Sequence, residues 1–422
     1  MPEPTGGTVP LTAGTTPSPP GPGAAPATHR VRQVPGFWLA LLGAPLGLSS
    51  TSPALILPDM AGDLGVSVAT VTWFVTVFFW AIAVGTPLVA GIVRRRGLRP
   101  ALMMSACCVA AGVVLVVASP WFPLIVLGRA AQAFGGAGLV TIGMNLAGSP
   151  RRMGLITAGA SMCGAVGPLG GSLIADAWSW HVSLALSAVT LLAVPAVARY
   201  TSPAPTAEPR TRFDFPGAAA TVALVTSLVF VPHHPVPAAV AAVVAAVLVG
   251  LRVRARPEGF VPSALLRSPV FLLSSVVAFA LSTSYFALLY AVPALLERDT
   301  SWSKGQIGTV QLVALVIGSA LSWGLAALSP RMNRPALLTV LIGLGALALA
   351  GAVLTPWAAL LPVVAAVALF AASSGQATLS HLTANAAREQ QRPTAIGLFN
   401  LCYQLGGAFG PAIVALLAIR RG

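Results

Sequence analysis

The side chains most able to do chemistry in this sequence are polar groups set inside long apolar runs. Arg129 and Gln132 lie three residues apart in the segment VLGRAAQAFGGAG. A charge inside a bilayer is costly, so such a residue usually faces a cavity or a partner. We predict that Arg129 and Gln132 line an internal binding site. The alternative is that the Arg129 side chain extends to the outer membrane surface.

Other apolar runs carry polar and aromatic residues that could line the same cavity. Trp73 and Trp80 are seven residues apart and therefore share one face of a helix. Hydroxyl, amide and aromatic groups around one arginine suit a large amphipathic molecule that is neutral or anionic. For each aromatic ring, contact with lipid or with the protein core is the alternative. The remaining predicted cavity residues are Ser49, Thr51, Tyr285, Tyr290, Asn400 and Gln404.

Acidic residues are scarce in these apolar runs. A group that couples proton movement to a conformational change must be protonated differently in the two states. Asp176 is our candidate for this role, because it ends a run that contains Pro168. The alternative is an acid at a helix end on the membrane surface. The acids nearest to the apolar runs all lie at predicted outer ends: Asp59, Asp63, Asp176, Glu297 and Asp299.

The elements that position these residues are apolar runs long enough to cross a bilayer. Charged residues make up only 8% of the chain, and the mean hydropathy is +0.86. A spanning helix needs about 20 mostly apolar residues. The sequence therefore predicts an all-α polytopic membrane protein. The predicted spans are 36–58, 69–93, 101–118, 121–147, 153–176, 181–199, 216–231, 236–252, 269–295, 305–328, 335–355, 357–381 and 393–418.

The arginines predict how these spans are oriented. Lys and Arg gather in the short cytoplasmic loops of membrane proteins. Arginine clusters precede the first span and follow the even-numbered spans, whereas the alternate loops carry only Arg298 and Lys304. The N-terminus is therefore predicted to be cytoplasmic, and the net charge of +14 reflects topology. These crossings would leave Arg420 and Arg421 outside, so we expect a further helix to be missing.

Composition divides the chain into four predicted parts. Residues 1–34 are rich in Pro, Gly, Thr and Ala and are predicted to form a disordered cytoplasmic tail. Residues 35–200 form a six-helix bundle, and residues 201–268 hold a Pro-rich linker and an extra helix pair. Residues 269–422 form a C-terminal bundle that is one helix short. Two bundles facing each other across a central cavity are the layout of a transporter.

Two further motifs support this layout. One is a short basic loop after the second span, and the other is a ladder of small residues that ends in Gly-Pro. Small residues let two helix backbones approach closely, and the proline bends the helix. A hinge between the two halves is predicted here, with ordinary small-residue packing as the alternative. The motif residues are Arg95, Gly97 and Arg99 in the loop, and Gly154, Gly167, Pro168 and Gly171 in the ladder.

Together with Arg129 and Gln132, these motifs resemble the major facilitator superfamily. Within it, the chain is similar to the 14-helix drug:proton antiporters, of a type found in actinobacteria. Two positions depart from that pattern. Ser49 stands where helix 1 of this branch usually carries an aspartate, and Arg94 replaces an acid in the basic loop. The resemblance implies export of a drug or antibiotic in exchange for protons.

We therefore predict a secondary transporter of the cytoplasmic membrane that exports an amphipathic small molecule by proton antiport. An uncoupled facilitator and a transport-inactive sensor or scaffold remain alternatives. The sequence has no phosphate-binding loop and no cluster of metal ligands, so we expect neither an enzyme nor a cofactor. It also lacks a basic soluble face with interleaved aromatics, so no nucleic-acid partner is expected. The oligomeric state stays open.

Overall fold

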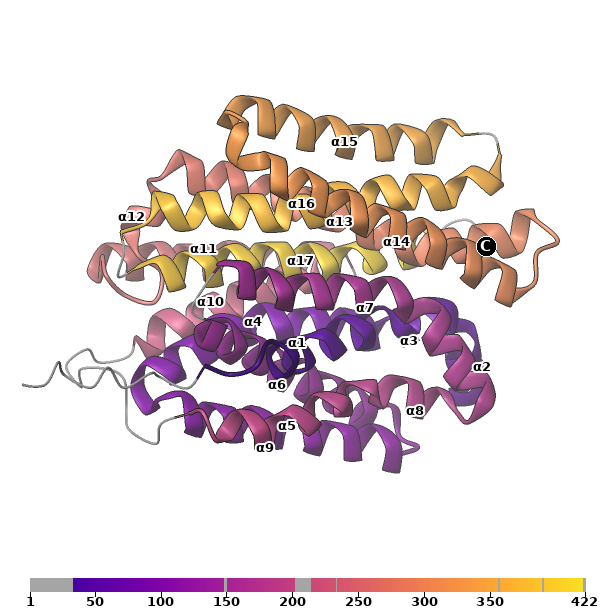
Figure 1. Cartoon of the computed structure of the whole chain (residues 1–422), viewed down its shortest axis with the longest axis horizontal. Coiled ribbons are helices and arrows are strands. Elements are labelled where there is room, and N and C mark those ends of the chain that lie inside the picture. Colours follow the sequence, from indigo (N-terminus) through magenta and orange to yellow (C-terminus); the bar gives the residue numbers. More distant parts are fainter. Residues whose placement is uncertain are drawn as a thin grey trace, which may run out of the picture. The chain divides into compact units, whose positions relative to one another are not determined.

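The apolar runs fold as helices in the computed structural model of the chain (Figure 1). The structure describes residues 33–147, 150–201, 214–232, 234–355, 357–388 and 391–419. Within these ranges every regular element is a helix, as the all-α prediction required. Residues from Val34 onward form one compact unit. Nearly all of the predicted tail lies outside the described residues.

The first part of the chain contains long helices and several short ones. They are α1 (Gly36–Thr51), the 3-10 helix η1 (Ser52–Leu55), α2 (Leu57–Leu64), α3 (Val68–Val71), α4 (Trp73–Arg96), α5 (Leu98–Ala118), α6 (Phe122–Ala147), α7 (Pro150–Ala177), α8 (Trp180–Leu184), the 3-10 helix η2 (Ala185–Ala193) and α9 (Val194–Ala198). We call α1 to α9 the first group.

The remaining elements begin after the predicted linker. They are α10 (Phe215–Phe230), α11 (Pro235–Ala255), α12 (Ser263–Leu266), α13 (Pro269–Asp299), α14 (Lys304–Leu328), η3 (Ser329–Arg331), α15 (Arg334–Leu354), η4 (Ala358–Leu360), α16 (Leu361–Ala386) and α17 (Arg392–Ile419). We call α13 to α17 the second group.

The described helices account for every predicted span. Eleven of them are long and apolar enough to cross a bilayer. The segment 36–64 adds a candidate span that is bent by 70° between its two helices, and α10 is a shorter apolar helix of 16 residues. This span begins where predicted, but its end differs, because the helix changes to 3-10 geometry at Ser52 and the chain bends after Leu55.

Packing follows the two groups. Within the first group α1 lies along α7, and α4 and α5 both pack on α6; within the second, α13 packs on α16 and α17. The groups meet mainly where α4 contacts α17 and where α7 contacts α14. α10 and α11 pack together as a hairpin, and α10 also contacts α4 and α17 (Figure 1). α11 exposes many valines and leucines, as expected for a helix that faces lipid.

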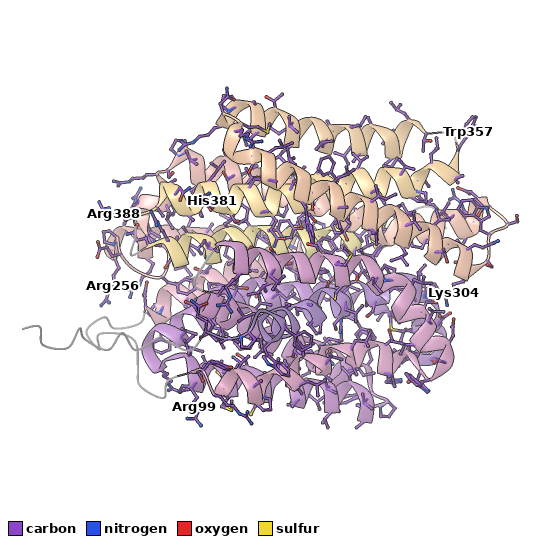
Figure 2. All side chains as sticks on the ribbon, viewed as in Figure 1. Arg99, Arg256, Lys304, Trp357, His381 and Arg388 are labelled. Carbon is purple, nitrogen blue, oxygen red and sulfur yellow. The ribbon has the colours of Figure 1, made fainter. Side chains whose placement is uncertain are left out.

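The charged residues labelled in Figure 2 lie at the helix ends. Arg99, Arg256 and Arg388 lie at one end of the helices, which we call the basic end, whereas Lys304 and Trp357 lie at the opposite end (Figure 2). This separation is what the distribution of arginines along the sequence predicted. That the basic end faces the cytoplasm stays a prediction.

Candidate functional site

Arg129, in α6, lies at the centre of a polar cluster in the apolar interior, and its side chain is fully buried. Its Nη1 donates to Ser49 Oγ at 3.0 Å, to Gln132 Oε1 at 3.1 Å and to the Leu184 carbonyl at 3.3 Å. Its Nη2 donates to the Ser49 carbonyl at 3.0 Å. The guanidinium carbon lies 4.1 Å from the centre of the Phe78 ring. The side chain therefore points inward and does not extend to the membrane surface.

The Ser49 carbonyl is available to Arg129 because a proline follows four residues later. In an α-helix this carbonyl would accept from the N–H of residue 53, and Pro53 has no N–H. The chain leaves α geometry at Ser52, where the 3-10 segment begins. Arg129 therefore caps the C-terminal end of α1, where the helix dipole also favours a positive charge.

A side chain also replaces a missing backbone donor at Pro168 in α7. Pro168 cannot donate to the Gly164 carbonyl, and that carbonyl instead accepts from Thr51 Oγ1 at 2.8 Å. In a bilayer a proline is tolerated where a neighbouring helix satisfies the freed carbonyl. Thr51 therefore fastens α1 to α7 and does not simply line a cavity.

A third case lies in α13 of the second group. Pro293 leaves the Leu289 carbonyl without its helical donor, and Gln311 Nε2 of α14 donates to it at 3.1 Å. The three cases share one geometry, in which a polar side chain from a neighbouring helix reaches a carbonyl four residues before a proline. They explain why these buried polar residues are tolerated in an apolar interior.

Tyr290 connects the second group to the C-terminal end of α1. Its hydroxyl donates to the Ser50 carbonyl at 2.8 Å, and its side chain is buried. Phe79 of α4 and Phe286 of α13 meet nearby along the same boundary, with ring centres 4.4 Å apart. The last turn of α1 thus accepts hydrogen bonds from Arg129 of the first group and from Tyr290 of the second.

None of the acids singled out in the sequence lies in the interior, where it could neutralise Arg129. All of these acids are exposed: Asp59, Asp63, Asp176, Glu297 and Asp299. Asp63 accepts from Trp180 Nε1 at 2.8 Å, and Asp176 is an exposed residue near the end of α7. The coupling role predicted for Asp176 therefore finds no buried environment in the structure. Among the described residues, Asp214 is the one buried carboxylate.

The two tryptophans predicted to line the cavity pack elsewhere. Trp80 Nε1 donates to Thr226 Oγ1 of α10 at 3.0 Å. Trp73 lies against Phe230 at the other end of α10, with ring centres 5.1 Å apart. Their shared helix face is as predicted, but that face contacts the extra helix pair. A 3.6-residue period fixes which residues share a face, and it does not identify the neighbour of that face.

The glycine ladder packs within the first group and not at its boundary with the second. A Cβ on Gly167 would lie 1.8 Å from Thr51 Oγ1, and one on Gly171 would lie 2.5 Å from the Ser52 carbonyl. These glycines allow close packing of α1 and α7, and α7 continues through Pro168. Because α7 also contacts α14 of the second group, the hinge role stays a prediction. Gly154 lies in α7, and its contacts are outside the described part of the structure.

The other predicted residues are spread over several elements. Gly97 adopts a φ of 84° between α4 and α5, a conformation that favours glycine. Arg99 is exposed at the start of α5, and the side chain of Arg95 lies outside the described residues. Tyr285 is buried in α13, whereas Asn400 and Gln404 are partly buried in α17. No hydrogen bond connects these last three to Arg129 within the described part of the chain.

Sequence reasoning missed three contributors to the cluster. Phe78 and the Leu184 carbonyl belong to other segments, and no local signal shows that they approach Arg129. Pro53 could have been found, because a proline four residues after Ser49 predicts a carbonyl in need of a donor.

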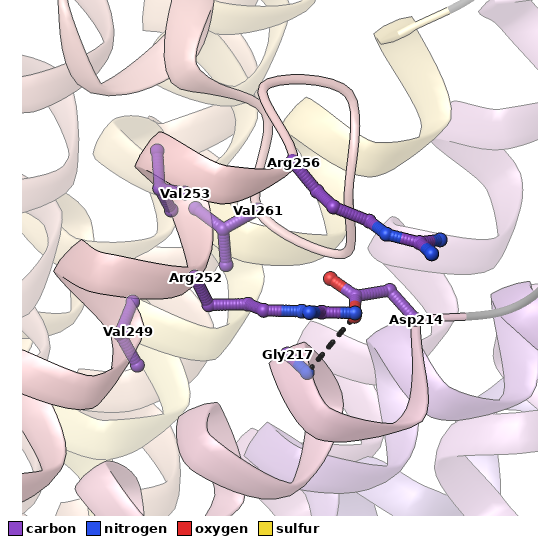
Figure 3. Close-up of a pocket in the computed structure, with 7 residues that line it drawn as sticks. All are labelled: Asp214, Gly217, Val249, Arg252, Val253, Arg256 and Val261. Atoms are coloured by element: carbon purple, nitrogen blue, oxygen red, sulfur yellow. Dashed lines mark hydrogen bonds and ion pairs between the residues drawn. The ribbon is translucent and has the colours of Figure 1, made fainter.

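A separate charged cluster lies at the start of α10 (Figure 3). Asp214 Oδ1 accepts from Arg252 Nε at 2.6 Å and from the Gly217 N–H at 3.2 Å, and Oδ2 accepts from the Phe260 N–H at 3.1 Å. Burial acts to raise the pKa of Asp214, but these hydrogen bonds and the charge of Arg252 outweigh it and lower the pKa. The space beside them is only about 10 Å³, too small for a ligand, so the cluster has a structural role.

Comparison with known proteins adds a family likeness. The family described as Major Facilitator Superfamily matches residues 37–411. The chloramphenicol resistance protein of Streptomyces lividans is 28% identical over 166 residues, which cover 38% of this chain and 42% of that protein. The multidrug resistance protein B homolog of Mycobacterium tuberculosis (strain CDC 1551 / Oshkosh) is 28% identical over 145 residues, covering 31% and 27%. Each match thus spans less than half of the curated relative.

A solved structure supports the fold over nearly the whole length. The crystal structure of the human organic anion transporter MFSD10 (TETRAN) superposes with a TM-score of 0.59. The superposition covers 91% of this chain and 94% of that one, at 17% sequence identity. At this identity the likeness concerns the arrangement of helices alone.

Proposed function

Because this chain belongs to the Major Facilitator Superfamily, whose profile matches residues 37–411, we propose that it is an exporter of amphipathic small molecules. It is a multi-pass membrane protein, as its many apolar helices indicate. In the proposed mechanism the two groups of helices rock about a shared interior site and expose it alternately on each side. We place it in the cytoplasmic membrane with the basic end facing the cytoplasm.

The observation that carries this proposal is the buried contact between the two groups at the C-terminal end of α1. Ser49 and Ser50 lie in the apolar interior, and their carbonyls accept from Arg129 and Tyr290, which belong to different groups. Separation of the groups would break the Tyr290 bond and leave the Arg129 bonds intact. A polar centre shared in this way is suited to bind a substrate in one state and to release it in another.

Drugs and antibiotics are the proposed cargo. The names of two relatives refer to chloramphenicol resistance and to multidrug resistance, which supports a xenobiotic or antibiotic substrate. A hydrophobic interior with few polar groups suits molecules that are largely apolar. The proposal is of a transporter and not of a membrane-embedded enzyme.

Proton antiport is the proposed driving reaction, supported by the resemblance to drug:proton antiporters. One observation favours the uncoupled facilitator instead. Ser49 occupies the position of the usual helix-1 acid, and Asp214, the one buried carboxylate among the described residues, caps α10. The two functions differ in whether transport runs against a gradient.

Efflux from cells and everted vesicles tests the proposal. The full chain is expressed in a bacterial host that lacks its major drug exporters, and chloramphenicol accumulation is measured. We expect reduced accumulation, loss of this effect in Arg129→Ala, and partial recovery in Arg129→Lys, which keeps the charge but not the planar fork. Arg331→Ala, which removes an exposed arginine, is the matched control and should behave as wild type.

Two outcomes separate the alternatives. Uphill transport that stops when the pH gradient is collapsed supports antiport, whereas downhill transport that ignores the gradient supports the facilitator. Normal membrane insertion with no transport of a broad panel of amphiphiles would favour a sensor or scaffold.

A further inference from the structure

Arg129 is a buried cation without an anionic partner among the described residues. The ion pairs of the described chain join Arg252 to Asp214, Arg298 to Asp299 and Lys304 to Asp59. The groups around Arg129 are carbonyls, a hydroxyl, an amide and an aromatic ring, all of them neutral. Dipoles solvate the charge but leave the site with a net charge of one positive unit.

Two buried donors next to this charge have no partner. They are Nε of Arg129 and Nε2 of Gln132, and both residues are fully buried. The Gln132 amide oxygen already accepts from Arg129, so its amino group needs an acceptor of its own. Neither atom can accept a hydrogen bond, because guanidinium and amino nitrogens only donate. The missing partner must therefore supply lone pairs.

Serine at position 49 explains why a negative charge next to Arg129 is missing. Ser49 Oγ lies 3.0 Å from Arg129 Nη1, so a carboxylate at this position would neutralise the guanidinium directly. With serine there, the chain leaves the neutralising charge to another molecule. An unpaired charge in a low-dielectric interior is strongly unfavourable, and binding of an anion would relieve it.

From these observations, and resting on the proposed transport function, we infer that the substrate is an amphipathic organic anion. Its carboxylate, sulfonate or phenolate oxygen accepts from Arg129 Nε and Gln132 Nε2 and supplies the counterion that position 49 lacks. Both donors are enclosed in this conformation, so the anion reaches them only after neighbouring segments move apart. A monoanion balances the single charge, whereas a cation would add a second positive charge to the same interior.

A set of three probes with one ring system tests this inference. Dansylate, dansylamide and dansylcadaverine share the same naphthalene core and carry a negative, a neutral and a positive group. Binding to the purified full chain is followed by probe fluorescence, and uptake is measured in everted proteoliposomes. We expect dansylate to bind most tightly to the wild type, about tenfold or more over dansylamide, the size expected for a charge-assisted hydrogen bond.

Ser49→Asp provides the decisive variant. It places an internal anion beside Arg129, so dansylate affinity should fall about tenfold or more and dansylcadaverine should bind better than dansylate. Ser49→Asn is the matched control for Ser49→Asp, with the same shape and no charge. The affinity for all three probes can fall in this variant, but dansylate should remain preferred over dansylcadaverine. Size-exclusion chromatography of the Ser49→Asn protein tests the fold, because monodisperse elution is expected if the larger side chain is tolerated.

The possible results are distinct. A preference for dansylate that reverses in Ser49→Asp and persists in Ser49→Asn supports the inference. A wild type that prefers the neutral or cationic probe, or three probes that fail to bind to folded protein, overturns it. The transport proposal is judged separately, because chloramphenicol efflux can persist when the anion preference is absent.

Discussion

Three residues, Thr51, Arg129 and Gln311, each donate to a carbonyl that a proline has deprived of its helical partner. A carbonyl left without a donor in hydrocarbon costs several kilocalories per mole, so each of these side chains stabilises a helix that is not its own. Because the donor comes from a neighbouring helix, the same bond also fixes how two helices pack. Local chain chemistry and tertiary packing are therefore coupled at single residues.

The Thr51 bond can be tested by a double-mutant cycle. Thr51→Val keeps the shape and removes the hydroxyl, and we expect the free energy of unfolding to fall by about 1–3 kcal/mol. In a Pro168→Ala background the restored N–H of residue 168 bonds to the Gly164 carbonyl, so Thr51→Val should then be nearly neutral. Thermal unfolding of the four purified proteins measures the coupling. Equal effects in both backgrounds would show that the hydroxyl acts elsewhere.

Asp176 gives a second prediction for a single residue. Its side chain is exposed near the end of α7, away from the buried cluster around Arg129. We therefore expect Asp176→Asn to keep gradient-driven transport within about twofold of wild type, a change below 1 kcal/mol. The measurement is uphill chloramphenicol transport in everted vesicles at matched expression. Loss of uphill transport with retained downhill exchange would restore Asp176 as the coupling residue.

At the scale of elements, the extra helix pair depends on the Asp214 cluster. Asp214 caps α10, pairs with Arg252 of α11 and accepts from Phe260 in the following loop. One carboxylate thus connects three consecutive segments. Figure 3 shows Asp214 beside Gly217 of α10 and Arg252 of α11. Because α10 also contacts α4 and α17, the cluster helps to position the hairpin against both groups.

Asp214→Asn should weaken this hairpin. The amide loses the ion pair with Arg252, and we expect a loss of stability of about 1.5–3 kcal/mol, as for hydrogen bonds to a charged group. The folded pKa of Asp214 is lowered, so its stabilisation is complete above about pH 4 and is lost as the pH falls through the folded pKa. Thermal stability measured against pH should show this acid-side loss in the wild type.

Glu258→Gln is the matched control for Asp214→Asn. Glu258 is an exposed acid in the same loop region, and its neutralisation should leave the stability almost unchanged. A similar loss of stability in both variants would indicate a general charge effect and not the Asp214 cluster.

Elements were predictable where one physical signal decides. Length and apolarity alone located the spans, because a helix must satisfy its own backbone when it crosses a bilayer. Arg129 stood out because it is a charge within an apolar run. The bend after Leu55 was missed, because the residues on both sides of it, Ala54 to Leu57, are apolar. The contact of Trp80 with α10 could not be predicted, because period and composition do not specify which helices become neighbours.

At the scale of the whole molecule, contacts between the two groups lie at more than one depth. Tyr290 holds the Ser50 carbonyl in the interior. At the end opposite the basic end, Lys304 of α14 pairs with Asp59 of α2. Leu55 and Leu169 also lie against Gly308 of α14. Separation of the groups on this side requires the loss of both apolar packing and an ion pair.

We expect Asp59→Ala to favour separation at this end by a small amount. The pair is partly exposed, so its contribution is at most about 1 kcal/mol, or about fivefold in an opening equilibrium. The measurement is the rate at which a thiol reagent labels Leu55→Cys after the four native cysteines are replaced by alanine. The increase should disappear at high salt, which screens exposed charges.

Asp63→Ala serves as the control for this experiment. Asp63 contacts Trp180 within the first group, so its loss should not change the labelling rate. Faster labelling in both variants would indicate that α2 packs less tightly in each of them. The Lys304–Asp59 ion pair would then not explain the closure of this end.

The shared capping of α1 also constrains how the protein is made. Helix α1 leaves the ribosome with a carbonyl at Ser49 whose donor, Arg129, is made eighty residues later. Its carbonyl at Ser50 waits for Tyr290, 240 residues later. During synthesis the end of α1 must stay near water or the insertion machinery until α13 has been delivered. A nascent chain halted before α13 would therefore carry an unfinished first helix, a defect that membrane quality control could recognise.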